Sequence, residues 1–453
     1  MTEAARANQR DHPSDLEQPG TSPRNQADAS QAPLGSLHIT AASMDPALLD
    51  LPWSIPLEEW PKENLAALPR GISRHVVRFA KLSDSLIAIK ETSERVALRE
   101  YEMLRKLRRL NIPCVAPVAV ITGRTDKDGE ELAPVLVTRH LRFSLPYRAV
   151  FSQTLRAVTL TRLIDAQALL LVRLHLAGFY WGDVSLSNTL FRRDAGAFAA
   201  YLVDAETGEL YPELSPGQRE YDLEIARVNI AGELMDLAEG GLIEENIDPL
   251  ATSERIMDSY RNLWAELTEQ ESFELGERWR VNARIRRLNE LGFDVDELTI
   301  RTTPDGSQVQ LQPKVVDAGH HQRRLLRLTG LDAQENQARR LLNDLDSYRA
   351  DNHPDLDEEL SAHLWVTQVF EPIVKAVPRE LGSKLEQAEV VHEVLEHRWY
   401  LSEKENRNVG LAEAVQSYLD TELRHRRDEA AILLNPDTKT MSILEGGGTP
   451  DQP

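Results

Sequence analysis

The sequence predicts an α+β protein with two lobes, one rich in strands and one helical, followed by a mainly α-helical accessory domain with one β-hairpin. Three observations lead to this fold class. Short β-rich runs surround a single helical pattern between residues 74 and 138. Longer amphipathic helices follow between residues 154 and 267. A hairpin pattern and several more helices then extend to residue 427.

Composition sets the expected domain boundaries. Residues 1–45 are rich in Asn, Gln, Ser and Pro and contain few large apolar side chains, so their burial cannot offset the entropy lost on ordering. We expect a disordered tail there and a second one at 431–453, which contains three consecutive glycines. Between the tails we expect a small lobe at 46–141, a large lobe at 142–270 and the accessory domain at 271–430.

The chain is strongly acidic. It has 73 Asp and Glu residues against 52 Lys and Arg, a net charge of −21, which argues against nucleic acid and anionic membranes as partners. Cys114 is the single cysteine, so the sequence excludes an internal disulfide and a cysteine-based zinc site. The sequence has no run of about 18 apolar residues that would predict a transmembrane segment. We therefore expect a cytoplasmic protein.

The small lobe begins with an irregular, tryptophan-containing segment at residues 48–60, which we expect to pack on a domain edge. β-branched runs bounded by turn residues predict the strands that follow, and the spacing of leucines predicts one helix among them. The predicted elements are strands at 74–80 and 85–90, a helix at 95–110, and strands at 115–122 and 134–138.

The large lobe is expected to open with a buried helix at 154–176, because its apolar residues are dense and Gly178 follows at a position that suits a helix end. Two short strands, 189–192 and 199–203, flank the turn signal Asp194-Ala195-Gly196. Two amphipathic helices complete this lobe, at 219–237 and 253–267.

The accessory domain is expected to begin with an Arg-rich helix at 278–291. Leu298 and Ile300 then face Val309 and Leu311 in a predicted hairpin. Further helices are predicted near 320–329, 333–348, 356–376, 385–400 and 409–427. The arginines of this domain either form a solvated face that pairs with acidic helices, or form an anion- or nucleic-acid-binding surface. Aromatic residues are too sparse there to predict stacking on single strands.

Three side chains that carry oxygen atoms suited to metal binding lie in the stretch that follows the first large-lobe helix. Asp183 and Asn188 lie five residues apart on the loop before the hairpin, and Asp204 comes directly after it. Hard oxygen ligands in this arrangement suit phosphates bound through Mg²⁺. The alternative is structural, with Asp183 and Asn188 capping a loop and Asp204 capping a turn.

These motifs carry a resemblance. Over about residues 68–265 the chain resembles the protein-kinase-like superfamily, particularly its bacterial lipopolysaccharide kinase (Kdo/WaaP-type) and aminoglycoside-phosphotransferase-like branches. The matching segments are Trp181-Gly182-Asp183-Val184-Ser185-Leu186-Ser187-Asn188 and Leu202-Val203-Asp204-Ala205-Glu206. The resemblance implies a two-lobed protein-kinase-like fold. It also implies that Asp183 is the catalytic base or orients the acceptor, and that Asn188 and Asp204 are metal ligands.

The small lobe offers the nucleotide-binding pair that this resemblance implies. Lys90 ends the run Ile87-Ala88-Ile89-Lys90, where kinase-like folds place a lysine against the α- and β-phosphates. Glu100, on the following helix, is the expected partner, and Glu102 is the alternative because the two point to different helix faces. The structural interpretations are an exposed strand-end lysine and a solvated glutamate.

The chain also departs from the superfamily pattern. Only Gly71 stands where a Gly-rich loop is expected, and Ser185 stands where many relatives carry a Lys or His that neutralises the transferred phosphoryl group. No Ala-Pro-Glu motif follows Asp204, which argues against a protein kinase with a regulated activation loop. Asp222 has two interpretations: a buried acid that braces the catalytic loop, or an exposed acid at a helix N-terminus. His175 is interpreted as a core histidine.

The function expected from these observations is ATP-dependent phosphoryl transfer to a hydroxyl of a small molecule or sugar, with ATP and Mg²⁺ as cofactors. The alternative is a pseudokinase or nucleotide-binding scaffold with the C-terminal domain as its interaction module. Nucleotidyl transfer would use the same residues. Residues from about 270 to 430 resemble an uncharacterised domain that accompanies lipopolysaccharide-kinase-like lobes. We expect this domain to select a substrate or bind a protein partner.

Overall fold

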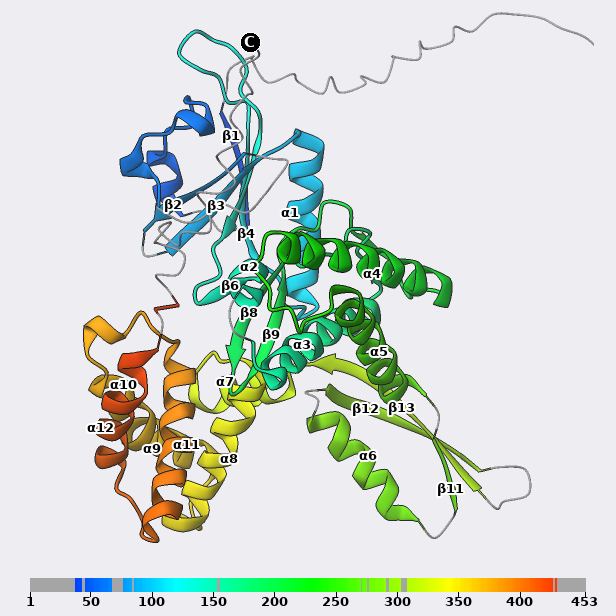
Figure 1. The fold of residues 1–453 in the computed structure, drawn as a ribbon, viewed down its shortest axis with the longest axis vertical. Coiled ribbons are helices and arrows are strands. Elements are labelled where there is room, and N and C mark those ends of the chain that lie inside the picture. The colour runs from blue at the N-terminus through cyan, green and yellow to red at the C-terminus, as the bar shows by residue number, and fades with distance from the viewer. Residues whose placement is uncertain are drawn as a thin grey trace, which may run out of the picture.

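The structure is a computed structural model. It describes residues 37–42, 45–66, 76–83, 85–152, 155–269, 271–274, 277–290, 293–302, 308–426 and 428–429. Figure 1 shows a small sheet-rich lobe at one end of the long axis, a helical lobe in the middle and the accessory domain at the other end. The fold class is the expected one, α+β with a sheet-rich lobe, a helical lobe and an α-rich accessory domain. No helix in the described part of the chain is long and apolar enough to cross a membrane.

The small lobe is one five-stranded antiparallel sheet with strand order β1-β4-β5-β3-β2. Its β2–β3 hairpin, its helix and its last two strands agree with the sequence prediction. Lys90 on β3 stands opposite Val77 of β2 and Leu136 of β5, so it lies on an interior strand. The elements are β1 (His38–Ala41), β2 (Val77–Leu82), β3 (Ser85–Glu91), α1 (Glu94–Arg109), β4 (Ala116–Thr122) and β5 (Val135–Arg139).

One correction concerns β1, which lies within the range 1–45 that the composition predicts to be a disordered tail. Its backbone pairs with β4, with Ile39 opposite Ile121. Pairing with an edge strand satisfies the backbone groups of a short segment whose side chains bury little surface. The prediction is therefore wrong for this strand. The rest of that range up to residue 36, and the predicted C-terminal tail, lie outside the described residues.

The two faces of the sheet have different coverings. Ile87 and Ile89 face the segment that precedes β2, where Leu48, Trp53 and Trp60 are buried. This segment forms short 3₁₀ turns, η1 (Pro46–Asp50), η2 (Leu57–Glu59) and η3 (Lys62–Asn64). The opposite face packs on α1, and the strand alternation directs Lys90 toward that helix.

A buried arginine holds the covering segment in place. Arg124 donates hydrogen bonds to the carbonyls of Trp53 and Ile55 at 3.1 and 2.8 Å, and its Nη1 lies 3.0 Å from Glu91 Oε1. Glu91 also accepts a hydrogen bond from the Leu57 backbone N–H at 3.2 Å. Since Glu91 directly follows Lys90 on β3, the packing of the covering segment fixes the end of the strand that carries the lysine.

The large lobe packs its helices around α3, which is apolar on most sides, as expected for a buried helix. The helix ends before Gly178, whose φ of +77° and close approach to the Tyr211 carbonyl leave no room for a Cβ atom. The elements are β6 (Ser144–Pro146), α2 (Tyr147–Phe151), α3 (Ala157–Leu176), β7 (Phe179–Tyr180), β8 (Thr189–Asp194), β9 (Ala197–Leu202), β10 (Glu209–Leu210), α4 (Pro216–Glu239) and α5 (Pro249–Thr268).

The accessory domain combines a three-stranded sheet with a helical bundle. Ile300 pairs with Leu311 as predicted, while the turn residues 304–306 lie outside the described residues. β11 is an additional strand that the sequence did not predict. The elements are β11 (Glu271–Glu274), α6 (Arg278–Glu290), β12 (Phe293–Thr302), β13 (Gln308–Ala318), α7 (His320–Thr329), α8 (Glu335–Asn352), α9 (Glu358–Trp365), α10 (Glu371–Ala376), α11 (Gln387–Glu405) and α12 (Leu411–Thr421).

The helix predicted near 356–376 contains a π-helical turn, η4 (Val366–Phe370), between α9 and α10. Pro372, the second residue of α10, has no backbone N–H to donate, which explains why the regular bonding pattern changes just before it. Among the described arginines, Arg324 lies 2.7 Å from Glu358 and 3.2 Å from Asp346. Intramolecular pairing therefore accounts for at least part of the local basic character.

Candidate functional site

Lys90 meets three carboxylates at the junction of the two lobes. Its Nζ lies 2.8 Å from Glu100 Oε2 on α1 and 2.7 Å from Asp204 Oδ2, just beyond the end of β9. Glu206 Oε2 is 3.2 Å away. Residues more than a hundred positions apart in sequence thus converge on one ammonium group, and the predicted site residues Lys90, Glu100 and Asp204 lie together.

The electrostatics of this cluster follow from its burial. Glu100 is 2% exposed, and burial, together with the charge of Asp204, raises its pKa to about 7 against the opposing effect of Lys90. Burial acts to lower the pKa of Lys90, but the carboxylates of Glu100 and Asp204 outweigh it and raise that pKa. The ammonium is therefore charged at neutral pH, surrounded by an excess of carboxylate.

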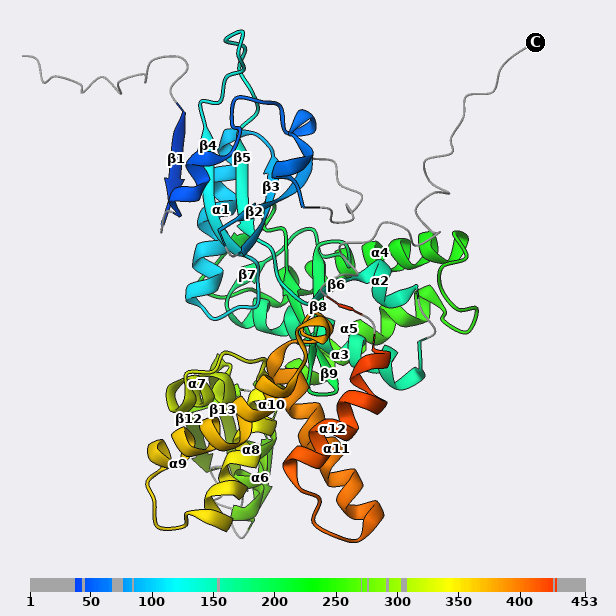
Figure 2. The same ribbon diagram turned by 90° about the vertical axis from the view of Figure 1, so that its left-hand side faces the viewer.

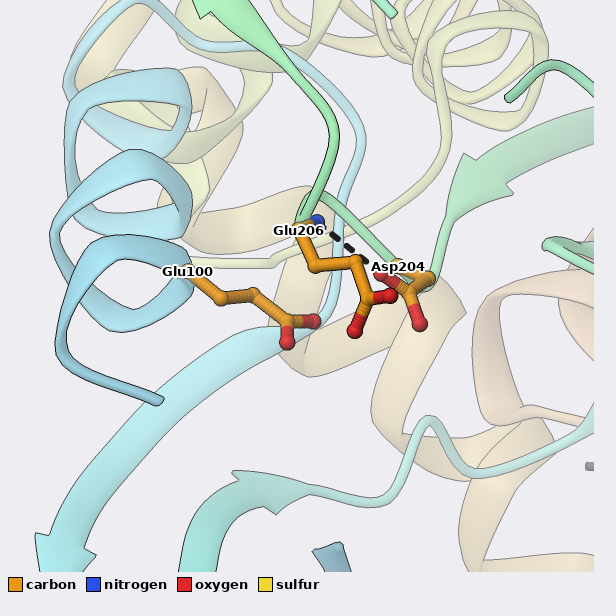
Figure 3. Close-up of side chains that lie close together, drawn as sticks. All are labelled: Glu100, Asp204 and Glu206. Carbon is orange, nitrogen blue, oxygen red and sulfur yellow. Dashed lines mark hydrogen bonds between the residues drawn. The ribbon is translucent and has the colours of Figure 1, made fainter. Parts of the chain in front are cut away.

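The carboxylates suit a divalent cation as well as the lysine. Oxygen atoms of Glu100, Asp204 and Glu206 all lie within 4.8 Å of one another. Figure 3 shows Asp204 and Glu206 side by side on the segment after β9, with Glu100 approaching from α1. The Glu206 backbone N–H donates to Asp204 Oδ1 at 2.9 Å, which fixes the Asp204 carboxylate. Such a set of hard oxygen donors fits Mg²⁺.

Asp222 supports the loop that carries Asp183 through hydrogen bonds to the loop backbone. This carboxylate is fully buried on α4 and accepts hydrogen bonds from the backbone N–H groups of Trp181 at 2.9 Å and Gly182 at 2.8 Å. The φ of +75° at Gly182 belongs to the region that favours glycine. Of the two interpretations of Asp222, the buried brace is therefore correct.

His175 belongs to the same buried support. Its Nε2 lies 3.1 Å from Asp222 Oδ2, and its Nδ1 lies 2.7 Å from the Tyr260 hydroxyl. The side chain is inaccessible to solvent, and its contact with Asp222 orients that carboxylate. This agrees with its interpretation as a core histidine.

Asp183 and Asn188 are adjacent across the loop. The Asn188 amide Nδ2 donates to both the carbonyl and Oδ2 of Asp183, each at 3.1 Å. Asn229 on α4 holds the other Asp183 oxygen at 3.4 Å. Because the planar amide directs Nδ2 toward Asp183, its Oδ1 is directed away and can serve as a ligand.

The hairpin connects this loop to the carboxylate cluster. The Val203 backbone N–H donates to the Asn188 carbonyl at 3.0 Å, so Asn188 stands across from the residue that precedes Asp204. The Trp181 indole N–H donates to the Asp204 carbonyl at 2.9 Å. The base of the β8–β9 hairpin therefore holds Asn188 and Asp204 in a fixed relationship.

Ser185 is buried within the loop and bonded there. Its Oγ accepts the Asn188 backbone N–H at 3.2 Å and lies 3.1 Å from Ser187 Oγ. Glu233 on α4 accepts the neighbouring N–H groups of Leu186 at 2.7 Å and Ser187 at 3.0 Å. The hydroxyl thus shapes the loop and offers no cation to a phosphoryl group.

The structure also decides between the two glutamates considered as partners of Lys90. Glu102 is about half exposed and pairs with Arg105 at 2.8 Å, whereas Glu100 is buried against Lys90. The segment around Gly71, expected to cover the phosphates, lies outside the described residues.

Sequence reasoning assigned no role to Glu206, Asn229 or Glu233. The spacing Asp204-Ala205-Glu206 could have pointed to Glu206, because alternate residues after a strand can present two carboxylates to one side. Asn229 and Glu233 lie one helical turn apart on α4, on the face toward the loop. Their sequence contains no sign of that orientation.

Comparisons with known proteins find matches to two family models. Residues 74–224 match the lipopolysaccharide kinase (Kdo/WaaP) family, and residues 262–423 match a domain of unknown function, DUF4032. The resemblance seen in the motifs is therefore confirmed. No curated protein matches the chain significantly.

Many solved structures are similar to parts of the chain, and two of them illustrate the extent of the likeness. A chain from "WaaP in complex with acyl carrier protein" is 16% identical with a TM-score of 0.33, and the match covers 56% of this chain and 99% of that one. A chain of the yeast RNA Pol II CTD kinase complex is 16% identical with a TM-score of 0.24, over 32% of this chain and 49% of that one.

Proposed function

We propose that this chain is an ATP-dependent phosphotransferase that acts on a hydroxyl of a small molecule or sugar. The match to the lipopolysaccharide kinase family supports the reaction class and the choice of a sugar-like acceptor. The observation that carries the proposal is the convergence of Lys90, Glu100 and Asp204 between the lobes, with contacts of 2.7 and 2.8 Å. A lysine held in this way is suited to nucleotide phosphates.

The donor set supports Mg²⁺ as the cofactor. Asp204 and Glu206 would hold the ion, with Asn188 Oδ1 as a further ligand from the neighbouring loop. Bound there, Mg²⁺ would neutralise the charge of the transferred phosphoryl group. Lys90 would bind the α- and β-phosphates while the contact with Glu100 fixes the position of its ammonium group.

Asp183 is proposed to orient the acceptor hydroxyl and take its proton. Hydrogen bonds from Asn188 and Asn229 fix the carboxylate, and the side chain is partly exposed, so an acceptor can reach it. Positioning of a hydroxyl by a fixed carboxylate is the contribution that this reaction chiefly needs.

Calorimetric titration of the purified full-length chain with ATP and Mg²⁺ tests the proposal. We expect saturable binding that Asp204→Asn weakens strongly, together with slow ATP turnover that Asp183→Asn abolishes without changing affinity. No heat of binding with ATP and Mg²⁺ would refute the nucleotide site itself.

A second candidate function is a nucleotide-binding scaffold without transfer activity. Ser185 favours it, because the position that could supply a cation to the phosphoryl group carries a hydroxyl bonded within its own loop. Binding of ATP without turnover, unchanged by Asp183→Asn, would support this candidate. Mass spectrometry of the acceptor would separate phosphoryl from nucleotidyl transfer.

A further inference from the structure

The tip of the β8–β9 hairpin is buried in the accessory domain. Asp194, the last residue of β8, is 2% exposed and accepts hydrogen bonds from the start of α8. Its Oδ1 accepts the Gln337 backbone N–H at 2.8 Å, and its Oδ2 accepts the Asn336 amide Nδ2 at 2.9 Å. Backbone N–H groups in the first helical turn have no partner within the helix. Asp194 therefore caps a helix of the accessory domain.

Gln337 and Glu389 complete a buried network around this contact. The Gln337 side-chain Nε2 donates to Glu389 Oε2 on α11 at 2.7 Å and lies 3.2 Å from the Arg193 carbonyl. Glu389 Oε2 also accepts the Ala195 backbone N–H at 2.9 Å. Two helices of the accessory domain thus hold, through hydrogen bonds, the turn of a hairpin that belongs to the large lobe.

The backbone conformation of the turn depends on these hydrogen bonds. Ala195 has a φ of +50° and Gly196 a φ of +82°, which is the left-handed conformation that a two-residue hairpin turn requires. Alanine adopts it only at a cost in free energy, and such a residue persists where its surroundings fix it. The hydrogen bond from Ala195 to Glu389 supplies that constraint.

Three further contacts flank the turn. Arg192 Nη2 lies 2.5 Å from Glu386 Oε1, and Arg193 Nε lies 2.5 Å from Glu429 Oε1. The Tyr201 hydroxyl donates to Gln334 Oε1 at 2.5 Å. Both strands of the hairpin are therefore attached to the accessory domain, and Glu429 and Gln334 are buried in doing so.

The opposite end of the same hairpin carries the site. Six residue pairs link the strands from Asp194 opposite Ala197 to Thr189 opposite Leu202. Asn188 directly precedes Thr189, and Asp204 lies two residues beyond Leu202. Figures 1 and 2 show the hairpin spanning from the large lobe to the accessory helices. The hairpin is thus a continuous paired ribbon between the accessory helices and the site.

We infer that Asp194 and Gln337 are positioning residues, through which the accessory domain sets the pose of Asn188 and Asp204. This inference rests on the proposed function for its effect on nucleotide and metal binding. It assigns the accessory domain a role in completing the phosphotransfer site.

The test uses the full-length chain and three variants. Asp194→Ala removes both acceptors, while Asp194→Asn retains one oxygen for the Gln337 N–H, since Asn is a good helix cap. The matched control is Asp344→Ala, which removes a half-buried acceptor of the Trp365 indole N–H at 2.7 Å, a contact that lies within the accessory domain. Calorimetry gives the affinity for ATP and Mg²⁺, and amide hydrogen exchange reports on residues 189–206.

We expect Asp194→Ala to weaken binding of ATP with Mg²⁺ about tenfold and Asp194→Asn less, in the range of other couplings between sites. Exchange should accelerate at Val203 and Glu206 in Asp194→Ala and remain unchanged in Asp344→Ala. Equal effects of Asp194→Ala and Asp344→Ala, or unchanged exchange at these amides in Asp194→Ala, would overturn the inference. The exchange measurement decides the matter even if the wild-type chain binds no nucleotide, which would refute only the proposed function.

Discussion

Lys90 Nζ lies 2.7 Å from Asp204 Oδ2, so the lysine of the small lobe bonds directly to a carboxylate at the base of the large-lobe hairpin. This ion pair joins the two lobes across the proposed nucleotide site. Phosphates would compete for the lysine and Mg²⁺ for the carboxylate. Nucleotide and metal binding should therefore replace an existing attraction between the lobes, and each should assist the other.

Replacement of Lys90 by methionine should lower both the stability of the fold and the affinity for ATP, and a second substitution should restore only the stability. Lys90→Met leaves Glu100 buried without a cation, and breaking such a pair costs about 3 kcal/mol. Urea unfolding followed by tryptophan fluorescence should show this loss. In the double variant with Glu100→Gln most of the stability should return, because the glutamine carries no charge, whereas ATP affinity should stay low in both. Failure of the second substitution to restore stability would show that the two residues are not coupled.

Metal affinity should depend on pH through Glu100. Because its pKa is raised to about 7, Glu100 is largely protonated below that pH and gains a negative charge above it. A bound cation favours the charged form, so affinity for Mn²⁺, measured by electron paramagnetic resonance, should rise from about pH 6 to about pH 8. Glu100→Gln should remove this rise. A rise of the same size in the variant would assign the pH dependence to another group.

Much of the site could be predicted because it is built from local signals. A lysine at the end of an interior strand, a helix directly after it and an acid on each side of a hairpin are all visible as short patterns. The choice between Glu100 and Glu102 was also available in the sequence. Glu100 shares its helix face with Leu104 and Leu107, which are buried, while Glu102 faces away from them.

The attachment of the accessory domain could not be predicted in this way. Asp194 contacts residues more than 140 positions later, and Arg193 reaches Glu429 across 236 positions. These contacts join single polar side chains, which produce no hydrophobic period in either partner. The four-residue strand β1 escaped prediction for a related reason, since pairing of its backbone with β4 and not its composition determines its structure.

Asp222 should matter for stability and for the pose of Asp183. Asp222→Ala leaves the N–H groups of Trp181 and Gly182 and the His175 ring without their acceptor, which should cost about 3 kcal/mol. Asp236→Ala, an exposed acid on the same helix, should change stability by less than about 0.5 kcal/mol. Thermal and urea unfolding compare the two. Similar losses in both variants would contradict the bracing role.

Ser185 provides the last prediction, because the resemblance places Lys or His at this position in many relatives. Here the side chain is 5% exposed and its Oγ accepts the Asn188 backbone N–H at 3.2 Å. A lysine would have to bury its ammonium or displace the loop. We therefore expect Ser185→Lys to lower stability without raising turnover, and Ser185→Ala to cost about 1 kcal/mol through the lost hydrogen bond.

Ser347→Ala is the matched control for these variants, since Ser347 is exposed on α8 and its hydroxyl donates to the Asn343 carbonyl of its own helix at 3.0 Å. Its stability should stay close to that of the wild type. ATP turnover and urea unfolding of all three variants check the prediction. Faster turnover with undiminished stability in Ser185→Lys would mean that this position opens onto the phosphates, and that a missing cation limits the rate of transfer.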